Sequence, residues 1–128
     1  MTGVQTCALP IYRPDTLTDR NVQKITEYIN RHFREDISIS DLAEKFFLSK
    51  SYIARIFKRA HHMGTAAYIN RMRLQAAAEL LLATELPIGM IAVQCGYINV
   101  YYFNRLFRRL YRMTPGEFRR SGYSERTQ

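Results

Sequence analysis

The chain has 128 residues, and its 19 Lys and Arg against 11 Asp and Glu give a net charge of +8 and a sequence pI near 9.8. A hydrophobic content of 47% excludes a disordered chain, and no run approaches the roughly 18 apolar residues of a transmembrane helix. Two cysteines exclude a disulfide framework and indicate a reducing, cytoplasmic protein. The basic balance points to a polyanionic partner, nucleic acid before an acidic membrane surface.

Residues 1–11, MTGVQTCALPI, carry no charge and no usable periodicity. They lack the basic start and the long apolar run of a signal peptide. The segment corresponds to the translation of a common sequencing-adapter strand, so we interpret it as a non-native artefact fused to a reading frame cut at its 5′ end. The alternative is a genuine disordered arm. If residues 1–11 are an artefact, Cys95 is the one native cysteine, and the cut reading frame leaves open a missing upstream domain.

From residue 12 onward, apolar spacing predicts helices along most of the chain. Residues 12–36 are expected to hold the end of a linker and a first helix, whose apolar side chains recur every three or four residues. Ser38 followed by Asp41 is a capping-box pattern that opens a short second helix. Ser49 can cap a third helix that runs to about residue 60.

Four further helices are predicted in the remainder of the chain. The longest covers residues 65–83, and Gly96 suits a turn that needs positive φ after the next one. No stretch alternates with period two for long enough to form a strand, so the predicted fold class is all-α with about seven helices. The last three helices begin near Pro87, Asn99 and the string Thr114-Pro115-Gly116-Glu117.

An internal repeat is the most informative feature. When the chain is shifted by 50 residues, RIFKR at 55–59 falls on RLFRR at 105–109, and Tyr68 falls on Phe118. In each copy a short helix and a turn of three or four residues come before this string, which is the arrangement of a helix-turn-helix unit. The predicted organisation is a first unit over 37–64, a linker helix over 65–84, a second unit over 85–122 and a disordered tail over 123–128.

The second helix of each unit divides into an apolar face and a basic face. On each of these helices the basic face carries an arginine in the first two turns and further cations in the third. This suits a helix whose first turns reach base edges in a major groove and whose last turn lies near phosphates. The alternative is a charged face that is merely solvated, and two homologous faces disfavour it. The side chains expected in the core are Ile53, Ile56 and Phe57 in the first unit and Phe103, Leu106, Phe107 and Leu110 in the second.

The positive charge is concentrated where these helices lie. Residues 13–48 contain six basic and seven acidic side chains, whereas residues 49–128 contain thirteen basic and four acidic ones. Such density drives salt-dependent phosphate binding by counterion release. The predicted linker helix is about 28 Å long, close to the roughly 34 Å between successive major grooves. Its Arg71 and Arg73 either touch phosphate or pair with an acid such as Glu79.

Short motifs spread over residues 37–120 match one known family. They include Leu48-Ser49 in the first unit, Arg71-Met72-Arg73-Leu74 in the linker helix, and Cys95-Gly96-Tyr97 and Met113-Thr114-Pro115 in the second unit. The segment resembles the DNA-binding domain of the AraC/XylS family of bacterial transcription regulators. The resemblance implies two subdomains joined by a long helix, which bind consecutive major grooves of double-stranded promoter DNA. It also implies activation, usually by contact with RNA polymerase, or repression, and an effector-sensing and dimerisation domain that normally lies upstream.

The helical faces and the resemblance together nominate the DNA contacts. Val100 and Tyr101 stand where relatives often have polar readers, which leaves Asn104 and Arg105 as the main polar candidates in the second unit. Met90 stands where an acid usually completes a helix cap. The candidates for reading bases are Ser51, Ala54, Arg55, Val100, Tyr101, Asn104 and Arg105, and those for binding phosphates are Lys50, Lys58, Arg59, Arg108, Arg109 and Arg112.

The sequence offers little support for catalysis, a metal or a cofactor. His61 and His62 are adjacent and point in different directions on a helix, so they are a poor chelate. Cys95 is expected to be a small buried side chain rather than a redox sensor. We therefore expect no enzyme, no cofactor and no membrane partner, and a cytoplasmic protein associated with the nucleoid through DNA. Two alternatives stay open: a non-specific architectural DNA-binding protein, and a basic helical module for protein or membrane contact.

Overall fold

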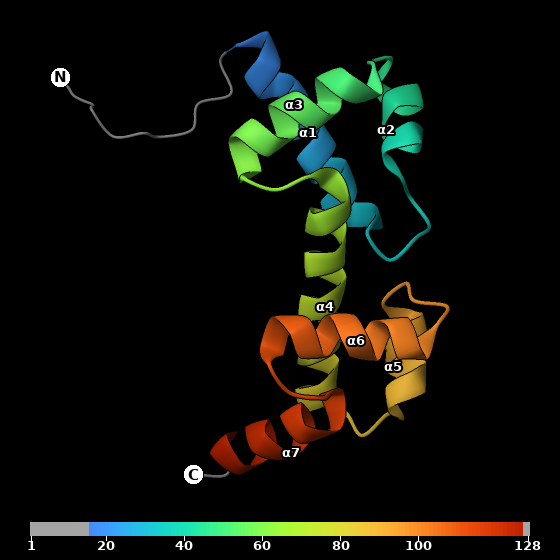
Figure 1. Cartoon of the computed structure of the whole chain (residues 1–128), viewed down its shortest axis with the longest axis vertical. Coiled ribbons are helices and arrows are strands. Elements are labelled where there is room, and N and C mark those ends of the chain that lie inside the picture. The colour runs from blue at the N-terminus through green and yellow to red at the C-terminus, as the bar shows by residue number, and fades with distance from the viewer. Residues whose placement is uncertain (1–15, 127–128) are drawn as a thin grey trace, which may run out of the picture.

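The computed structural model describes residues 16–126, so that the proposed artefact at 1–11 and the last two residues lie outside the described part. Within it the chain forms helices and no strand, which confirms the all-α prediction (Figure 1). No helix in this part of the chain is long and apolar enough to cross a membrane. The helices are α1 (Leu17–His32), α2 (Ile39–Phe46), α3 (Lys50–His61), α4 (Thr65–Ala83), α5 (Ile88–Gln94), α6 (Val100–Tyr111) and α7 (Pro115–Arg126).

Side-chain caps start α2, α6 and α7 where the sequence predicts them. Ser38 and Asp41 form a full capping box at α2, in which each side chain accepts from the other residue's backbone N–H. Asn99 accepts from two backbone N–H groups at the start of α6. Thr114 and Glu117 form a second reciprocal pair before α7, at 2.8 and 3.1 Å. The last helix continues to Arg126, so residues 123–126 are helical in the part that was expected to be a disordered tail.

The long helix α4 is the axis of the molecule, with one helix-turn-helix unit at each end (Figure 1). In the first unit α1 packs against α3 and buries Ile25 and Ile29. In the second unit α5 and α7 pack against α4, and Phe103 and Phe107 of α6 are fully buried. The predicted stripe of α6 ends earlier than expected: Leu106 is only partly buried and Leu110 is 37% exposed.

The repeat extends to the packing behind α3 and α6. In each unit a buried phenylalanine meets a ring one turn later and, edge to face, a ring from the following helix. The two helices also end alike, each with its capping residue in the left-handed conformation. The equivalent residues are Phe57, His61, Tyr68 and the cap His62 in the first unit, and Phe107, Tyr111, Phe118 and the cap Arg112 in the second.

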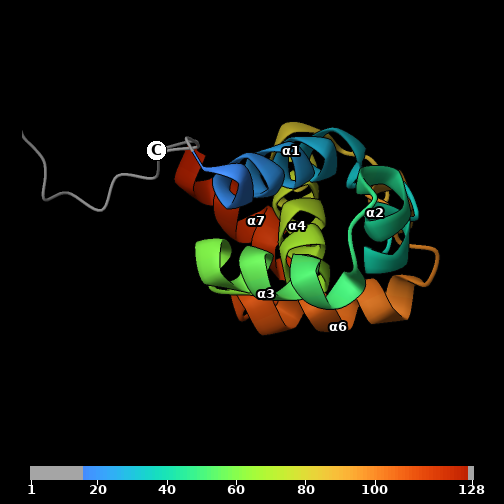
Figure 2. The same cartoon turned by 90° about the horizontal axis from the view of Figure 1, so that it is seen from above.

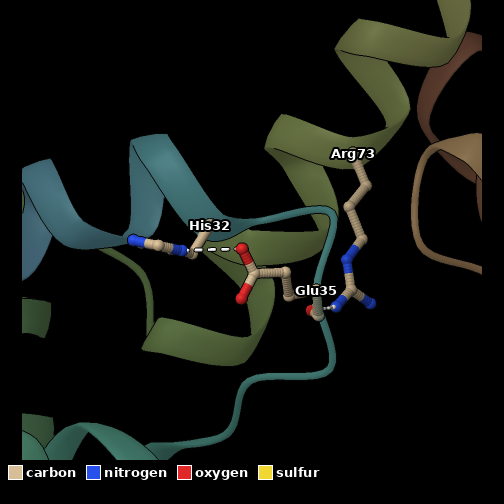
Figure 3. Close-up of polar contacts among 3 residues, drawn as sticks. All are labelled: His32, Glu35 and Arg73. Carbon is tan, nitrogen blue, oxygen red and sulfur yellow. Dashed lines mark hydrogen bonds and ion pairs between the residues drawn. The ribbon is translucent and has the colours of Figure 1, made fainter.

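Two arginines hold the ends of helices that precede them. Arg73 of α4 donates from Nη2 to the Glu35 carbonyl at 2.7 Å, just beyond α1 (Figure 3). Its Nε donates to the Phe33 carbonyl at 2.6 Å. Arg119 of α7 donates in the same way to the Leu81 carbonyl at the end of α4. The guanidinium groups donate to carbonyls at or just beyond the helix ends, where intrahelical N–H partners run out. The Glu35 carbonyl also accepts from the Ile37 backbone N–H at 2.9 Å. Arg73 is therefore engaged with the backbone, in place of the phosphate or acidic partner expected from the sequence.

Candidate nucleic-acid interface

The recognition helices α3 and α6 lie on the same side of α4 and run in nearly the same direction (Figures 1 and 2). The chain enters each of them from a short helix, α2 or α5, and continues into α4 or α7. Side chains of Ser49 and Asn99 cap their first turns, at equivalent positions of the repeat. Two parallel helices at the ends of a 19-residue rod form one extended surface.

The exposed face of α3 is polar and basic. Ile53, Ile56 and Phe57 are buried, as predicted, and this orients the opposite face toward solvent. Serine, alanine and arginine occupy the early turns of that face, and cations follow toward its end. The exposed candidates on α3 are Lys50, Ser51, Ala54, Arg55, Lys58 and Arg59.

The corresponding face of α6 is more apolar at its start. Tyr101 is 81% exposed, whereas Val100 is partly buried and packs against the core. Asn104 is also partly buried, and its Oδ1 is a buried atom with no hydrogen-bond partner among the described residues. The amide of Asn104 is thus less accessible than its sequence position suggests, and Arg105 is the exposed polar candidate on this helix. Arg108 and Arg109, and Arg112 at the helix end, are exposed cations.

A shallow hollow of about 470 Å³ lies over the second half of this face. Asn104, Arg105, Arg108 and Arg109 line it together with Thr114. The nearest acid in sequence, Glu117, is occupied as a cap: its hydrogen bonds with Thr114 are the main reason that the pKa of its carboxyl lies below its usual range, with smaller effects of Arg108 and Arg120. The hollow combines clustered positive charge with room for an anionic group.

The two arginines that are candidates for base reading each lie over a tyrosine ring, a contact that was not predicted. The guanidinium carbon of Arg55 is 5.3 Å from the centroid of the Tyr52 ring, and that of Arg105 is 5.6 Å from the Tyr102 ring. Both pairs are three residues apart, one turn along the helix. A Tyr-x-x-Arg string that recurs at the 50-residue offset is the signal that could have revealed them.

The described residues offer little support for a metal site or for a reactive cysteine or histidine. No group of three or more His, Cys, Asp or Glu side chains between residues 16 and 126 is arranged to hold a metal ion. Cys95 is a free, buried thiol, and burial raises its pKa above the ordinary value, as suits a small core side chain. His61 forms a hydrogen bond with Thr26 and contacts the Phe57 ring at a tilt, so it serves packing.

Two helix-turn-helix units with parallel, basic recognition helices define a DNA-binding domain. A family model described as a helix-turn-helix domain matches residues 42–121. The chain is 37% identical over 98 residues to the regulatory protein SoxS of Salmonella typhimurium, which covers 77% of this chain and 92% of SoxS. A probable AraC family transcriptional regulator from Rhodopseudomonas palustris has a solved structure with a TM-score of 0.72 and 28% identity, covering 80% of this chain and 97% of that one.

The chain belongs to the AraC/XylS family of transcription regulators, as the DNA-binding domain of that family. It is also 34% identical over 107 residues to the regulatory protein PocR of Salmonella typhimurium, an alignment that covers 84% of this chain. The chain spans 35% of the length of PocR. The domain is a sequence-specific binder of double-stranded DNA that acts in transcription regulation, and it is not an enzyme domain.

Proposed function

We propose that α3 and α6 enter consecutive major grooves of promoter DNA, so that a single chain reads two half-sites. The observation that carries this is the parallel placement of the two helices on one side of α4, each with an exposed arginine at the equivalent position (Figure 2). The 19 residues of α4 span about 28 Å, which suits grooves that repeat at about 34 Å when the tilt and width of the flanking helices are added.

In this proposal, Arg55 and Arg105 read bases, each able to offer two donors to the edge of a guanine. Ser51, Ala54, Val100, Tyr101 and Asn104 flank these arginines and shape the contact with neighbouring bases. The phosphates are bound by Lys50, Lys58 and Arg59 of the first unit and by Arg108, Arg109 and Arg112 of the second.

The experiment is a binding titration over a range of salt concentrations, with a duplex selected by the chain from a random pool. We expect Arg55→Ala and Arg105→Ala each to cost about 1–3 kcal/mol at one half-site and to relax base preference there. Lys58→Ala and Arg108→Ala are the matched changes on the same helices. They should weaken binding to all sequences alike and flatten the salt dependence by about one unit each.

The same titration distinguishes the alternatives. Equal affinity for all duplexes would favour a non-specific architectural protein. Binding to anionic vesicles that survives loss of both Arg55 and Arg105, without preference for any duplex, would favour a basic membrane or protein module. A base preference that Arg55→Ala leaves intact would remove that residue from the set of readers.

We further propose that the intact regulator activates transcription through RNA polymerase in the bacterial cytoplasm, where it is associated with the nucleoid through DNA. An effector-sensing and dimerisation domain would precede the DNA-binding domain. What supports these points is family membership, and, for the upstream domain, the greater length of PocR. Transcription from the selected promoter with purified polymerase tests activation, and the genomic sequence upstream of Tyr12 tests the missing domain.

A further inference from the structure

Each candidate reading arginine lies on a tyrosine that comes one turn earlier in the same helix. Tyr52 and Tyr102 are both the third residue of their helices, and both present the ring to a guanidinium 5.3 or 5.6 Å away. A ring beneath a guanidinium favours a subset of the many rotamers that an exposed arginine otherwise samples. The two arginines are therefore partly ordered before DNA arrives.

In the first unit this tyrosine is tied to α1. Its hydroxyl lies 3.4 Å from Thr18 Oγ1 and accepts a hydrogen bond from Asn21 Nδ2 at 3.5 Å. These two contacts, with a smaller effect of Arg55, lower the pKa of the Tyr52 hydroxyl below its ordinary value. The ring under Arg55 is thus fixed at its far end by the helix that precedes the unit.

In the second unit Tyr102 is connected to α4 through the ring of Tyr97. Tyr102 meets the edge of Tyr97, with ring centroids 6.2 Å apart. Tyr97 is 4% exposed, and its hydroxyl donates to Asn70 Oδ1 on α4 at 2.8 Å. Asn21 and Asn70 are 49 residues apart, the offset that also relates the short helices of the two units. Each unit therefore connects its tyrosine to an asparagine of the helix before it.

We propose that Tyr52 and Tyr102 are positioning residues that hold Arg55 and Arg105 in the orientation for base readout. Asn21 anchors the Tyr52 ring directly, and Asn70 anchors the Tyr102 ring through Tyr97. The inference rests on the base reading by the two arginines proposed above. Removing a ring leaves the charge of the arginine in place, so its attraction to phosphate persists. Base discrimination is expected to fall, while non-specific affinity and the salt dependence stay unchanged.

The test uses the full chain and the selected duplex, in competition with duplexes that carry a single base change in one half-site. Tyr52→Leu should reduce discrimination at the base pair that Arg55→Ala affects by about two- to fivefold, the size expected for an exposed cation–ring contact. Tyr52→Phe keeps the ring and loses the bonds to α1, so its effect should be smaller. Tyr102→Leu should act in the same way at the other half-site.

A double substitution separates positioning from direct contact. In the Arg55→Ala background, Tyr52→Leu should cause no further loss of discrimination, because the side chain that it positions is gone. Tyr28→Leu is the matched control: Lys45 lies 5.2 Å from that ring, the same kind of contact between α1 and α2, outside the recognition helices. It should leave discrimination unchanged, and thermal melts of all variants establish that they fold.

Three results would overturn the inference. Unchanged discrimination in folded Tyr52→Leu and Tyr102→Leu would show that the rings do not position the arginines. An equal loss in the presence and absence of Arg55 would mean that Tyr52 contacts the DNA itself. If Arg55→Ala leaves base preference intact while the chain still selects its duplex, base readout by Arg55 is wrong, and with it the positioning role of Tyr52. The Arg55→Ala variant alone gives that result, without any tyrosine variant.

Discussion

The two helix-turn-helix units place their recognition helices alike, yet they differ in the turn that leads into each helix. Phe47 follows α2 with a φ of 56°, whereas Gly96 stands at the matching point after α5 with a φ of 105°. A Cβ at position 96 would lie 2.8 Å from the Arg34 carbonyl oxygen and 2.9 Å from Arg73 Nε, while Phe47 is 92% exposed. The first turn tolerates a side chain because it faces solvent. The second excludes one because the backbone just after α1 and the Arg73 side chain of α4 lie against it.

The units differ again in their short helices. A capping box begins α2, whereas Pro87 precedes α5 and no side chain caps that helix. The outer face of α5 is apolar, with Met90 and Val93 exposed at 48% and 64%. The shared geometry therefore comes from the buried residues and from the positive φ in each turn, whereas caps and surface residues are free to diverge.

The largest expected effect tests whether the two units fold together. Phe57 and Phe107 are both fully buried at equivalent positions, so Phe57→Ala and Phe107→Ala should each lower the free energy of unfolding by about 3–5 kcal/mol. Because both units pack on α4, we expect one urea transition, followed by circular dichroism, in the wild type and in each variant. Two separate transitions would show that the units are independent.

Substitutions in the two turns should change the free energy of unfolding in opposite directions. Gly96→Ala should destabilise the chain by about 2–3 kcal/mol, because it combines a strained φ with a backbone clash. Phe47→Gly should stabilise it by about 0.5–1 kcal/mol, since relief of the left-handed strain outweighs the greater freedom of glycine in the unfolded chain. Urea denaturation measures both values. A loss of stability in Phe47→Gly would mean that the exposed ring makes a contact worth more than the strain.

The caps offer a smaller contrast. Ser38→Ala should cost about 1 kcal/mol, because it removes the acceptor for the Asp41 backbone N–H. Met90→Glu should add about 0.5 kcal/mol, since it places an acid in the uncapped first turn of α5. Met90→Gln is the neutral control for thermal melts, and an equal gain in both variants would exclude a charge effect.

The smallest contrast concerns the protonation of His61, which packs behind α3. The equivalent position behind α6 holds Tyr111. Burial and, to a lesser degree, His62 lower the pKa of His61 from its ordinary value of 6.5. The unfolded chain then binds the proton more readily, so the stability from this site is present above pH 6.5 and is lost as the pH falls through the folded-state pKa. We expect His61→Tyr to show a smaller fall in Tm than the wild type between about pH 7.5 and about pH 5.5. His32→Gln is the control, and a fall in His61→Tyr as steep as in the wild type would contradict the assignment.

Much of this molecule follows from short-range patterns. The caps at Ser38, Asn99 and Thr114, the bounds of α4 and the buried face of α3 were all predictable, because each depends on residues within about one or two helical turns. On α6 the same spacing predicted the burial of Phe103 and Phe107 correctly. The repeat adds the pairing of the two recognition helices and the positions of their arginines. Local rules and one internal comparison thus suffice for the fold class and for the candidate DNA-binding face.

Other features depend on which helices meet, and spacing along the chain does not reveal that. Arg73 looks like a surface cation in the sequence, yet tertiary packing brings it to the carbonyl groups at the end of α1. Leu110 continues the apolar stripe of α6, yet the core ends before it and leaves it exposed. The ties of Tyr52 to Asn21 and of Tyr97 to Asn70 join helices that are 31 and 27 residues apart. Such contacts form because the buried faces dock the helices, and only then do distant polar side chains come within hydrogen-bond distance.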